Sequence, residues 1–244
     1  MLRSHCLAAG RQCLQSVSLT ALLLATAIAT GVSSGGAAGA DSSSPQPYDR
    51  QTRTYSISID GTRRGSSKAE FRSKEGVVWI QSESVIKISY LVYKYNYSSS
   101  GTEVWKHGRV AAFENTADYN GTPFNVKGTA TPRGLQITTN GTTTIASPDV
   151  WDTSYLILPD RLARDPSTVT LLDSDKGALL SGKVQFVGEE RLDCEAGQKA
   201  CTHYHVSGDV QVDVWFDASH RLVRQESRER GHKVRFELLS VTAE

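Results

Sequence analysis

Alternating apolar and polar residues are the strongest pattern in this chain, and they are clearest between Cys194 and Val241. From Val210 to Phe216 the even-numbered residues are apolar and the odd-numbered ones are polar, apart from Trp215. A period of two is that of a β-strand with one buried face. The stretch therefore predicts three or four antiparallel strands, the last of them running from Lys233 to Val241.

The first strands of the domain show the same alternation. Tyr55, Ile57 and Ile59 are separated by polar residues, and Asp60-Gly61 then opens a turn that leads into a second strand ending near Phe71. Glycine after aspartate favours the tight turn of a hairpin. The sequence thus predicts a β-hairpin here.

A long extended segment follows from Val77 to Tyr90, with Ser82 and Ser84 in the middle of its apolar face. Small polar residues in such a place indicate a bend, a bulge or the wall of a cavity. A strand that crosses the edge of the sheet accounts for them more simply, and this is the interpretation that we favour.

Tyr93, Tyr95 and Tyr97 lie at a spacing of two, which places them on one face of a strand. Such a stripe is typical of core or cross-strand packing. The alternative is a stripe that lines a ligand cavity.

Turn signals recur between Gly101 and Ser147, at His107-Gly108, Asn120-Gly121, Arg133-Gly134 and Asn140-Gly141. Asn-Gly pairs supply the positive φ angles of type I′ hairpins. The region therefore predicts an antiparallel meander.

The strand pattern is interrupted between Pro148 and Arg164. Ser147 is a suitable N-cap for a short helix with Pro148 at its first position, and the apolar residues from Trp151 to Leu158 would form one face before Pro159 ends it. A single helix in a chain of strands often lies across the open side of a sheet.

Together these patterns predict a mainly β fold with one strongly curved antiparallel sheet of about ten strands. The sheet would form a half-barrel or open barrel, with the short helix across its open side. We expect three segments: a secretory signal peptide over residues 1–40, a polar tether over 41–50 and a single β domain over 51–244.

The first forty residues have the layout of a secretory leader. Arg3 and Arg11 precede an apolar run from Leu19 to Ile28, and Ala38-Gly39-Ala40 fits a cleavage site. The run is shorter than the roughly 20 residues of a membrane-spanning helix. We therefore expect an exported protein, periplasmic or extracellular, that is not an integral membrane protein after cleavage.

The charge of the expected mature chain is close to neutral. Residues 41–244 contain 25 Lys and Arg against 26 Asp and Glu, because the leader holds two of the 27 basic residues and none of the acidic ones. A nucleic-acid-binding domain should be clearly basic. We therefore expect no nucleic-acid partner.

Two cysteines, Cys194 and Cys201, remain after the expected cleavage. A pair of cysteines in an exported chain predicts a disulfide, which here would close the short loop from Glu195 to Ala200. A metal pair is the alternative, although six intervening residues exceed the usual spacing of a zinc knuckle.

Candidate chemistry is sparse. His203 and His205 follow Cys201 at spacings of two and would share one strand face, which makes them weak candidates for a metal site. Two histidines on a solvated strand face are the simpler interpretation. After the expected leader, the chain has no G-x-S-x-G, no H-E-x-x-H and no phosphate-binding glycine loop. We expect no catalytic residue, no cofactor and no enzymatic activity.

The order of several landmarks resembles that of an exported bacterial family catalogued as a domain of unknown function, over roughly residues 52–241. The landmarks are Tyr55 with the Asp60-Gly61 turn, Glu103 and Trp105, Ala117-Asp118-Tyr119-Asn120-Gly121, Thr202-His203-Tyr204, and the hairpin from Val214-Trp215-Phe216-Asp217 to Arg221-Leu222-Val223. The layout also resembles, more distantly, the curved sheets of periplasmic lipoprotein carriers. That likeness implies a concave face that shelters acyl chains.

The leading functional hypothesis is a non-catalytic exported module that binds a hydrophobic ligand or a lipidated protein in its concave face. The expected lining residues are Val78, Ile80, Tyr93, Tyr95, Trp151 and Tyr155. The alternative is a structural or assembly factor of the cell envelope with a packed core and a protein partner on a sheet edge. A metal-dependent enzyme centred on His203 and His205 is the third hypothesis.

Overall fold

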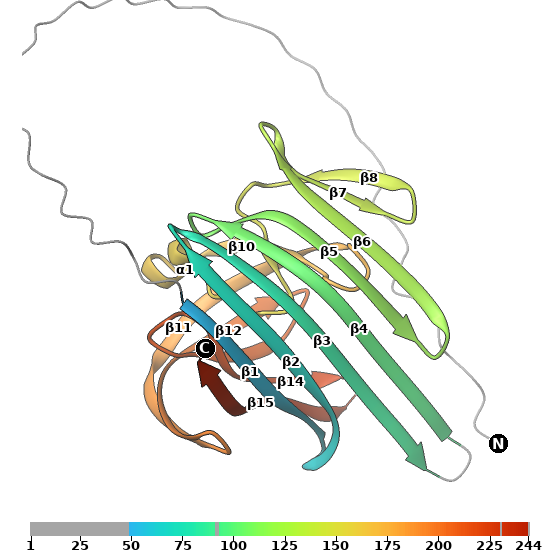
Figure 1. The fold of residues 1–244 in the computed structure, drawn as a ribbon, viewed down its shortest axis with the longest axis vertical. Helices are drawn as coiled ribbons and strands as arrows, with labels where there is room; N and C mark the ends of the chain where they lie inside the picture. Colours follow the sequence, from blue (N-terminus) through green and yellow to red (C-terminus); the bar gives the residue numbers. More distant parts are fainter. Residues whose placement is uncertain (1–48, 91–92, 230, 244) are drawn as a thin grey trace, which may run out of the picture. The chain divides into compact units, whose positions relative to one another are not determined.

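A computed structural model of the protein describes residues 49–90, 93–229 and 231–243. These residues form fifteen β-strands in one sheet and one short helix, α1 (Asp160–Arg164) (Figure 1). The strands are β1 (Asp49–Ile59), β2 (Thr62–Lys74), β3 (Val77–Tyr90), β4 (Tyr93–Lys106), β5 (Arg109–Tyr119), β6 (Thr122–Thr131), β7 (Gly134–Thr139), β8 (Thr142–Ala146), β9 (Trp151–Asp152), β10 (Thr168–Leu172), β11 (Leu179–Cys194), β12 (Gly197–Gly208), β13 (Val212–Phe216), β14 (Leu222–Glu229) and β15 (His232–Ala243).

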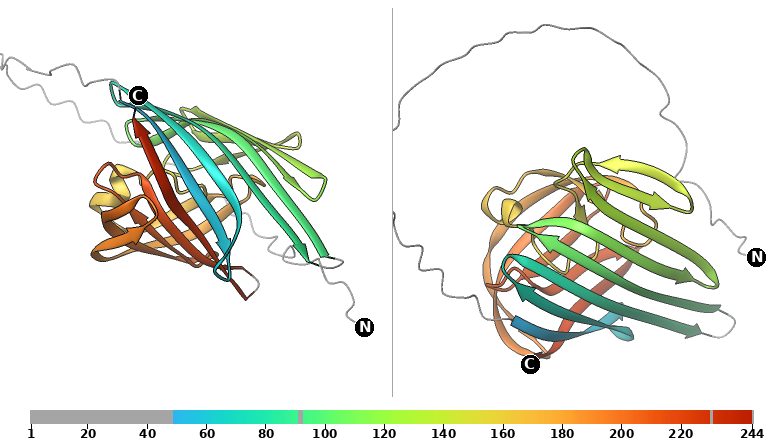
Figure 2. Two further views of the ribbon diagram at one scale, coloured as in Figure 1. Left: turned by 60° about the horizontal axis from the view of Figure 1, so that its bottom comes forward. Right: turned by 45° about the horizontal axis from the view of Figure 1, so that its top comes forward.

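Strand order in the sheet follows chain order almost throughout. The strands run outward from β1 to β8 on one side and from β15 to β9 on the other, and β1 pairs with β15. All pairs are antiparallel except β9 with β10. The sheet is not closed, because β8 and β9 are its two ends, and Figure 2 shows how it curls.

The predicted mainly β fold with one unclosed sheet is therefore confirmed, but the number of strands is wrong. The sheet has fifteen strands and not about ten. Four of them, β7, β8, β9 and β10, have only two to six residues. Segments this short contain too few alternations to give a periodic signal.

The predicted hairpin turns form where the sequence places them. Asn120 and Gly121 connect β5 to β6, and Asn140 and Gly141 connect β7 to β8, all with positive φ. Two successive residues with positive φ are the signature of a type I′ turn, whose twist matches that of the flanking strands. These turns fix the register of the meander.

The core lies against one face of the sheet, which we call the inner face. Phe71, Ile80 and Trp105 on β2, β3 and β4 are at most 2% exposed. They pack with the segment 147–178, which contains β9, α1 and β10 and contributes further buried side chains. Segment 147–178 therefore covers the inner face of β2, β3 and β4.

The predicted helix from Trp151 to Leu158 is wrong in position. Tyr155 has a φ of 53°, which is incompatible with a right-handed helix, and the Asp152 side chain accepts a hydrogen bond from the Ser154 backbone N–H in a local turn. Pro159, expected to end the helix, instead stands immediately before α1. Proline suits a helix start because the first N–H groups have no intrahelical partner.

β3 is not at a sheet edge, contrary to the interpretation favoured above. It pairs with β2 on one side and with β4 on the other, without a register shift in either pairing. The Ser84 hydroxyl donates a hydrogen bond to the Ser67 hydroxyl on β2 (2.9 Å). The small polar residues thus lie on the inner face of a central strand.

The predicted leader, residues 1–40, lies outside the described residues, as does the predicted tether except for Asp49 and Arg50, which begin β1. Among the helices of the described residues, none is long and apolar enough to cross a membrane.

Candidate functional site

Three of the residues expected to line a ligand site are buried in the core. Ile80, Trp151 and Tyr155 are 2%, 0% and 3% exposed. The Trp151 ring contacts the rings of Tyr155 and Phe216 with centroids 4.8 and 6.1 Å apart, and its Nε1–H donates to the Ile157 carbonyl (2.8 Å). These side chains fill the space at the inner face that we expected a ligand to occupy.

The other three expected lining residues lie on β3 and β4. Val78 is half-buried against the core, and Tyr95 is half-buried farther along β4. Tyr93 lies at the start of β4, and its side chain is outside the described part of the structure. The five residues whose side chains are described line neither of the two pockets described below.

Two carboxyl groups are buried side by side at the inner face. Glu103 on β4 accepts hydrogen bonds from the Trp105 indole N–H (2.8 Å) and the Ser154 hydroxyl (3.0 Å). Burial raises the pKa of Glu103 well above its usual range, and the neighbouring Asp152 carboxylate raises it further. Burial also raises the pKa of Asp152. Because both groups are shielded from solvent, this pair ties segment 147–178 to β4 and offers no access to a substrate.

A second polar cluster holds the turn after β10 against β4 and β5. The Asp175 carboxylate accepts hydrogen bonds from the Tyr97 hydroxyl and the Asn115 amide (both 2.9 Å) and from the Tyr119 hydroxyl. The Tyr97 and Tyr119 rings also contact each other edge-on, with centroids 4.9 Å apart. Tyr97 from the tyrosine stripe is thus a packing residue of the fold.

A pocket opens between α1 and strands β11 and β12. We call it the helix-side pocket; its volume is about 440 Å³. Leu158, Tyr204 and Phe216 lie at its floor and are at most 3% exposed, and polar side chains such as Arg164 and Glu189 contribute to its walls. The lining residues are Leu158, Ala163, Arg164, Pro166, Phe186, Glu189, Thr202, Tyr204, Phe216, Asp217 and His220.

Exposed apolar side chains stand at the mouth of the helix-side pocket. Phe186 and Val187 on β11 are 55% and 54% exposed, and the Phe186 ring lies edge-on to Tyr204 with centroids 5.9 Å apart. A β-bulge accounts for this exposure: Phe186 pairs with Tyr204 and Gly188 pairs with His203, so Val187 is the extra residue. Bulges commonly re-aim side chains in this way.

Two of the charged groups at the rim of the helix-side pocket have ion-pair partners. Asp217 forms an ion pair with the buried Arg53 guanidinium, which also donates to the Leu222 carbonyl (3.0 Å). His220 Nδ1 lies 3.3 Å from an Asp160 carboxylate oxygen. Arg164 and Glu189 also line the pocket; both are exposed, and neither side chain has an ion pair among the described residues.

His203 and His205 lie on the outer face of the sheet, opposite the inner core, and have acidic partners that the sequence analysis missed. His203 Nε2 and His205 Nδ1 each lie 3.0 Å from one oxygen of Asp213, and His203 Nδ1 lies 3.3 Å from Glu190. The His203 ring stacks on Trp215 at 4.2 Å. Among the described residues, no group of three or more His, Cys, Asp or Glu side chains has an arrangement that could hold a metal ion.

The pairing registers explain why these acidic partners were missed. Asp213 faces His205 across the β12–β13 pair. Glu190 reaches the outer face only because of the bulge at Val187. A turn at Gly208 between two strands would have indicated that His205 faces Asp213. No pattern in the sequence marks the bulge that brings Glu190 to His203.

The predicted disulfide is not present, and Cys194 and Cys201 are free thiols. In the β11–β12 hairpin, Cys194 pairs with Gly197 and Cys201 pairs with Glu190. The two cysteines are thus four residues apart along the hairpin, roughly 13 Å at the rise of a strand. A disulfide needs Cα atoms within about 7 Å.

Comparison with known proteins gives a family and a fold. A family model described as "Domain of unknown function (DUF6134)" matches residues 55–239. A crystal structure of a β-barrel-like protein of domain of unknown function DUF1849 from Brucella abortus superposes with a TM-score of 0.61 at 9% identity, covering 80% of this chain and 98% of that chain. No curated protein matches. The expected resemblance to a family of unknown function is confirmed.

Proposed function

We propose a function for this chain, which belongs to the family described as "Domain of unknown function (DUF6134)": it is an exported, non-catalytic module that binds a hydrophobic ligand. The binding site is the helix-side pocket and not the site expected from the sequence, because Trp151 and Tyr155 are part of the packed core there. The ligand is a lipid or the acyl chain of a lipidated protein.

The observation that carries the proposal is the combination of an apolar floor with an exposed phenyl ring at the mouth. Solvent contact of Phe186 is unfavourable, by about 25 cal/mol for each Å² of apolar surface. A ligand that covers Phe186 and enters between Leu158 and Tyr204 would remove that contact. The volume of about 440 Å³ lies within the usual range for small-molecule sites.

The electrostatics of the rim favour an uncharged apolar group over a charged one. The Asp217 carboxylate is neutralised by Arg53, and His220 faces Asp160. A charged ligand would lose hydration, and the lining side chains without an ion pair, Arg164 and Glu189, are exposed and would contribute little to binding it. An acyl chain loses no such hydration and gains about 0.8 kcal/mol per buried CH₂ group.

Native mass spectrometry of the protein purified gently from an exporting host tests the proposal. We expect an added mass of lipid size that disappears on denaturation. The variant Phe186→Ser should lose most of that mass, whereas Trp79→Ser, which removes an exposed aromatic on β3 distant in sequence from the pocket, should retain it. Equal lipid retention by both variants would exclude the helix-side pocket as the site.

The structural or assembly factor is the second candidate, and the pairing of β11 favours it. β12 pairs with β11 from Gly182 to Cys194, whereas β10 pairs only with Leu179–Lys183. On the side away from β12, the remainder of β11 has no neighbouring strand in the described sheet, and a partner strand can add to such an edge. A bare mass in the native spectrum, together with co-purification of an envelope protein that Phe186→Ser abolishes, would support this candidate over the first.

A further inference from the structure

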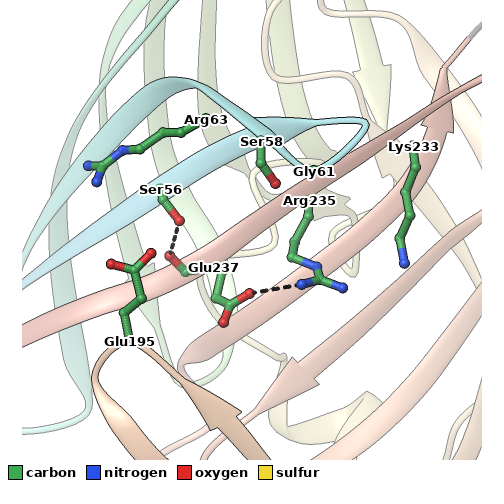
Figure 3. A pocket seen from close by; sticks show the side chains of 8 residues that line it. All are labelled: Ser56, Ser58, Gly61, Arg63, Glu195, Lys233, Arg235 and Glu237. Atoms are coloured by element: carbon green, nitrogen blue, oxygen red, sulfur yellow. Dashed lines mark hydrogen bonds and ion pairs between the residues drawn. The ribbon is translucent and has the colours of Figure 1, made fainter.

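A second pocket lies on the outer face of the sheet and has a different chemistry. It has a volume of about 350 Å³ and lies over β1 and β15, between the start of β2 and the tip of the β11–β12 hairpin (Figure 3). We call it the outer pocket. Its lining residues are Ser56, Ser58, Gly61, Arg63, Glu195, Lys233, Arg235 and Glu237.

One wall of the outer pocket exists because the β11–β12 hairpin reaches back to the C-terminal strands. The Ala196 N–H donates to the Leu238 carbonyl (3.4 Å), and the Arg224 guanidinium donates to the Asp193 carbonyl (2.8 Å). These contacts place Glu195, at the hairpin tip, over the outer face. The floor beneath is low, because Ser56 and Ser58 on β1 have small side chains.

The other end of the outer pocket is fixed by the turn between β1 and β2. The Asp60 N–H donates to the Lys233 carbonyl, and the Lys233 N–H donates to the Asp60 carboxylate, both at 2.9 Å. The turn therefore moves together with β15. This contact holds Gly61 close to Lys233 in the lining.

Two of the three cations in the lining are held by acidic side chains. Glu226 binds both Lys233 and Arg235 (2.7 Å each), and Arg235 also lies 3.5 Å from Glu237. Their positions are thus set before any ligand arrives, which lowers the entropy cost of binding. Both cations keep donors that a ligand can use, since an ammonium has three and a guanidinium five.

Arg63 and Glu195 differ from these residues. Both are exposed, and neither side chain has a hydrogen bond or ion pair with another described residue. Figure 3 shows both side chains at one end of the outer pocket and Lys233 at the other. One free guanidinium suits an acid group, which it can bind through two parallel hydrogen bonds. A free carboxylate suits a donor such as a hydroxyl group.

We propose that the outer pocket binds an acidic monosaccharide, a small sugar that carries one carboxylate or phosphate group. Arg63 binds the acid group, Glu195 accepts from sugar hydroxyls, and the Ser58 hydroxyl and Lys233 complete the polar contacts. A neutral sugar lacks the group that Arg63 recognises. A small anion lacks the hydroxyls that Glu195 recognises. The pocket therefore requires both features in one molecule.

Isothermal titration of the whole protein with four probes tests this site: D-glucuronate, D-glucose 6-phosphate, D-glucose and inorganic phosphate. We expect saturable binding of at least one acidic sugar, and binding at least about 10-fold weaker for glucose and for phosphate alone. The relative affinity of the two acidic sugars decides between carboxylate and phosphate. The proposal is overturned if neither acidic sugar binds saturably, or if phosphate alone binds as tightly.

Matched variants locate the binding. Arg63→Gln should weaken binding of the acidic sugar by about 10-fold or more, because a charge-assisted bidentate contact is lost. Glu195→Gln should weaken it by a smaller factor. Arg133→Gln removes an exposed arginine from the turn between β6 and β7 and should have no effect. Equal affinity of Arg63→Gln and Arg133→Gln would place the sugar elsewhere on the molecule.

Discussion

Strands β4 and β11 show two ways in which a long strand can serve a core. In β4, residues 95 to 105 alternate regularly, with the odd-numbered positions turned toward the inner core and the even-numbered ones more exposed. In β11, the even-numbered Val184 and Leu192 are both buried, but they lie on opposite faces. The bulge at Val187 separates them. One extra residue thus lets β11 contribute to the inner core and to a smaller buried cluster on the outer face.

That second cluster distinguishes the C-terminal strands from the N-terminal ones. Cys201 and Trp215 are 4% and 8% exposed on the outer face, and the Arg224 guanidinium lies over the Trp215 ring (5.9 Å). The equivalent face of β3 leaves Trp79 42% exposed. The difference arises from the β11–β12 hairpin, which covers only the C-terminal strands.

The largest expected effect is on the inner core. Trp105→Ala should lower the free energy of unfolding by about 3–5 kcal/mol. It opens a cavity under segment 147–178, and it removes the indole N–H that donates a hydrogen bond to Glu103. Trp79→Ala should change the free energy of unfolding by less than about 1 kcal/mol. Urea unfolding measures both, and equal losses would show that the two faces of the N-terminal strands do not differ in the way described.

The Glu103 carboxyl makes the stability of the inner core depend on pH. Its pKa is raised by burial and by Asp152, so the folded protein binds more protons than the unfolded chain above pH 4.5, the usual pKa of glutamate. This contribution to stability is therefore largest in acid and falls as pH rises, by at most about 1.4 kcal/mol per pH unit.

Glu103→Gln is the matched variant, because glutamine keeps the shape and an acceptor for the Trp105 N–H but does not titrate. We expect its advantage over the wild type in free energy of unfolding to increase from pH 5 to pH 8. Parallel pH profiles of the two proteins would show that Glu103 is ionised in the folded state.

Leu192→Ala tests the smaller cluster on the outer face. We expect a loss of about 2 kcal/mol, the lower end of the range for buried leucine, because this cluster is small and close to solvent. Val187→Ala, which shortens the exposed bulge residue, should have little effect. A loss as large as that of Trp105→Ala would mean that the outer cluster is as important to folding as the inner core.

We expect the smallest change in stability from substitution of the cysteines. The state of the two thiols is therefore better tested by their reactivity than by unfolding. Burial raises the pKa of the Cys201 thiol to about 12 and also raises the pKa of Cys194. Since the thiolate is the reactive form, Cys201 in the native protein should react with a thiol reagent at pH 8 at least about 100-fold more slowly than in urea. The variant Cys194→Ser assigns the signal. In a chain of residues 41–244 without reductant, two thiols should react in urea; a count of zero would establish the disulfide that the register argues against.

Local patterns predicted the parts of the fold that depend on neighbouring residues. The turns at Asn120-Gly121 and Asn140-Gly141 formed where expected, because their backbone conformation is a property of the dipeptide. The alternation of β1, β2 and β15 was also visible, since one face of each of these strands remains in contact with solvent. The predicted helix failed because Asp152 and Ser154 bind backbone groups locally and compete with a helix.

The candidate sites were much less predictable, because each depends on strands that are distant in the sequence. The helix-side pocket joins residues from Leu158 to His220, and the outer pocket joins residues from Ser56 to Glu237. Tyr155 and Trp151 are residue types that often line ligand sites. In this fold both side chains are packed in the core. Composition alone does not distinguish an aromatic ring that lines a cavity from one that fills it.

The sequence by itself determined the class of the fold, the hairpin turns and the membership of a family of unknown function, because periodicity and turn chemistry act over a few residues. Only the tertiary structure decided which face each residue occupies after the bulge at Val187, that Cys194 and Cys201 stay apart, and where the pockets open. The physical reason is register. A shift of one residue in strand pairing reverses the face of every side chain beyond it, while the pattern along the chain stays the same.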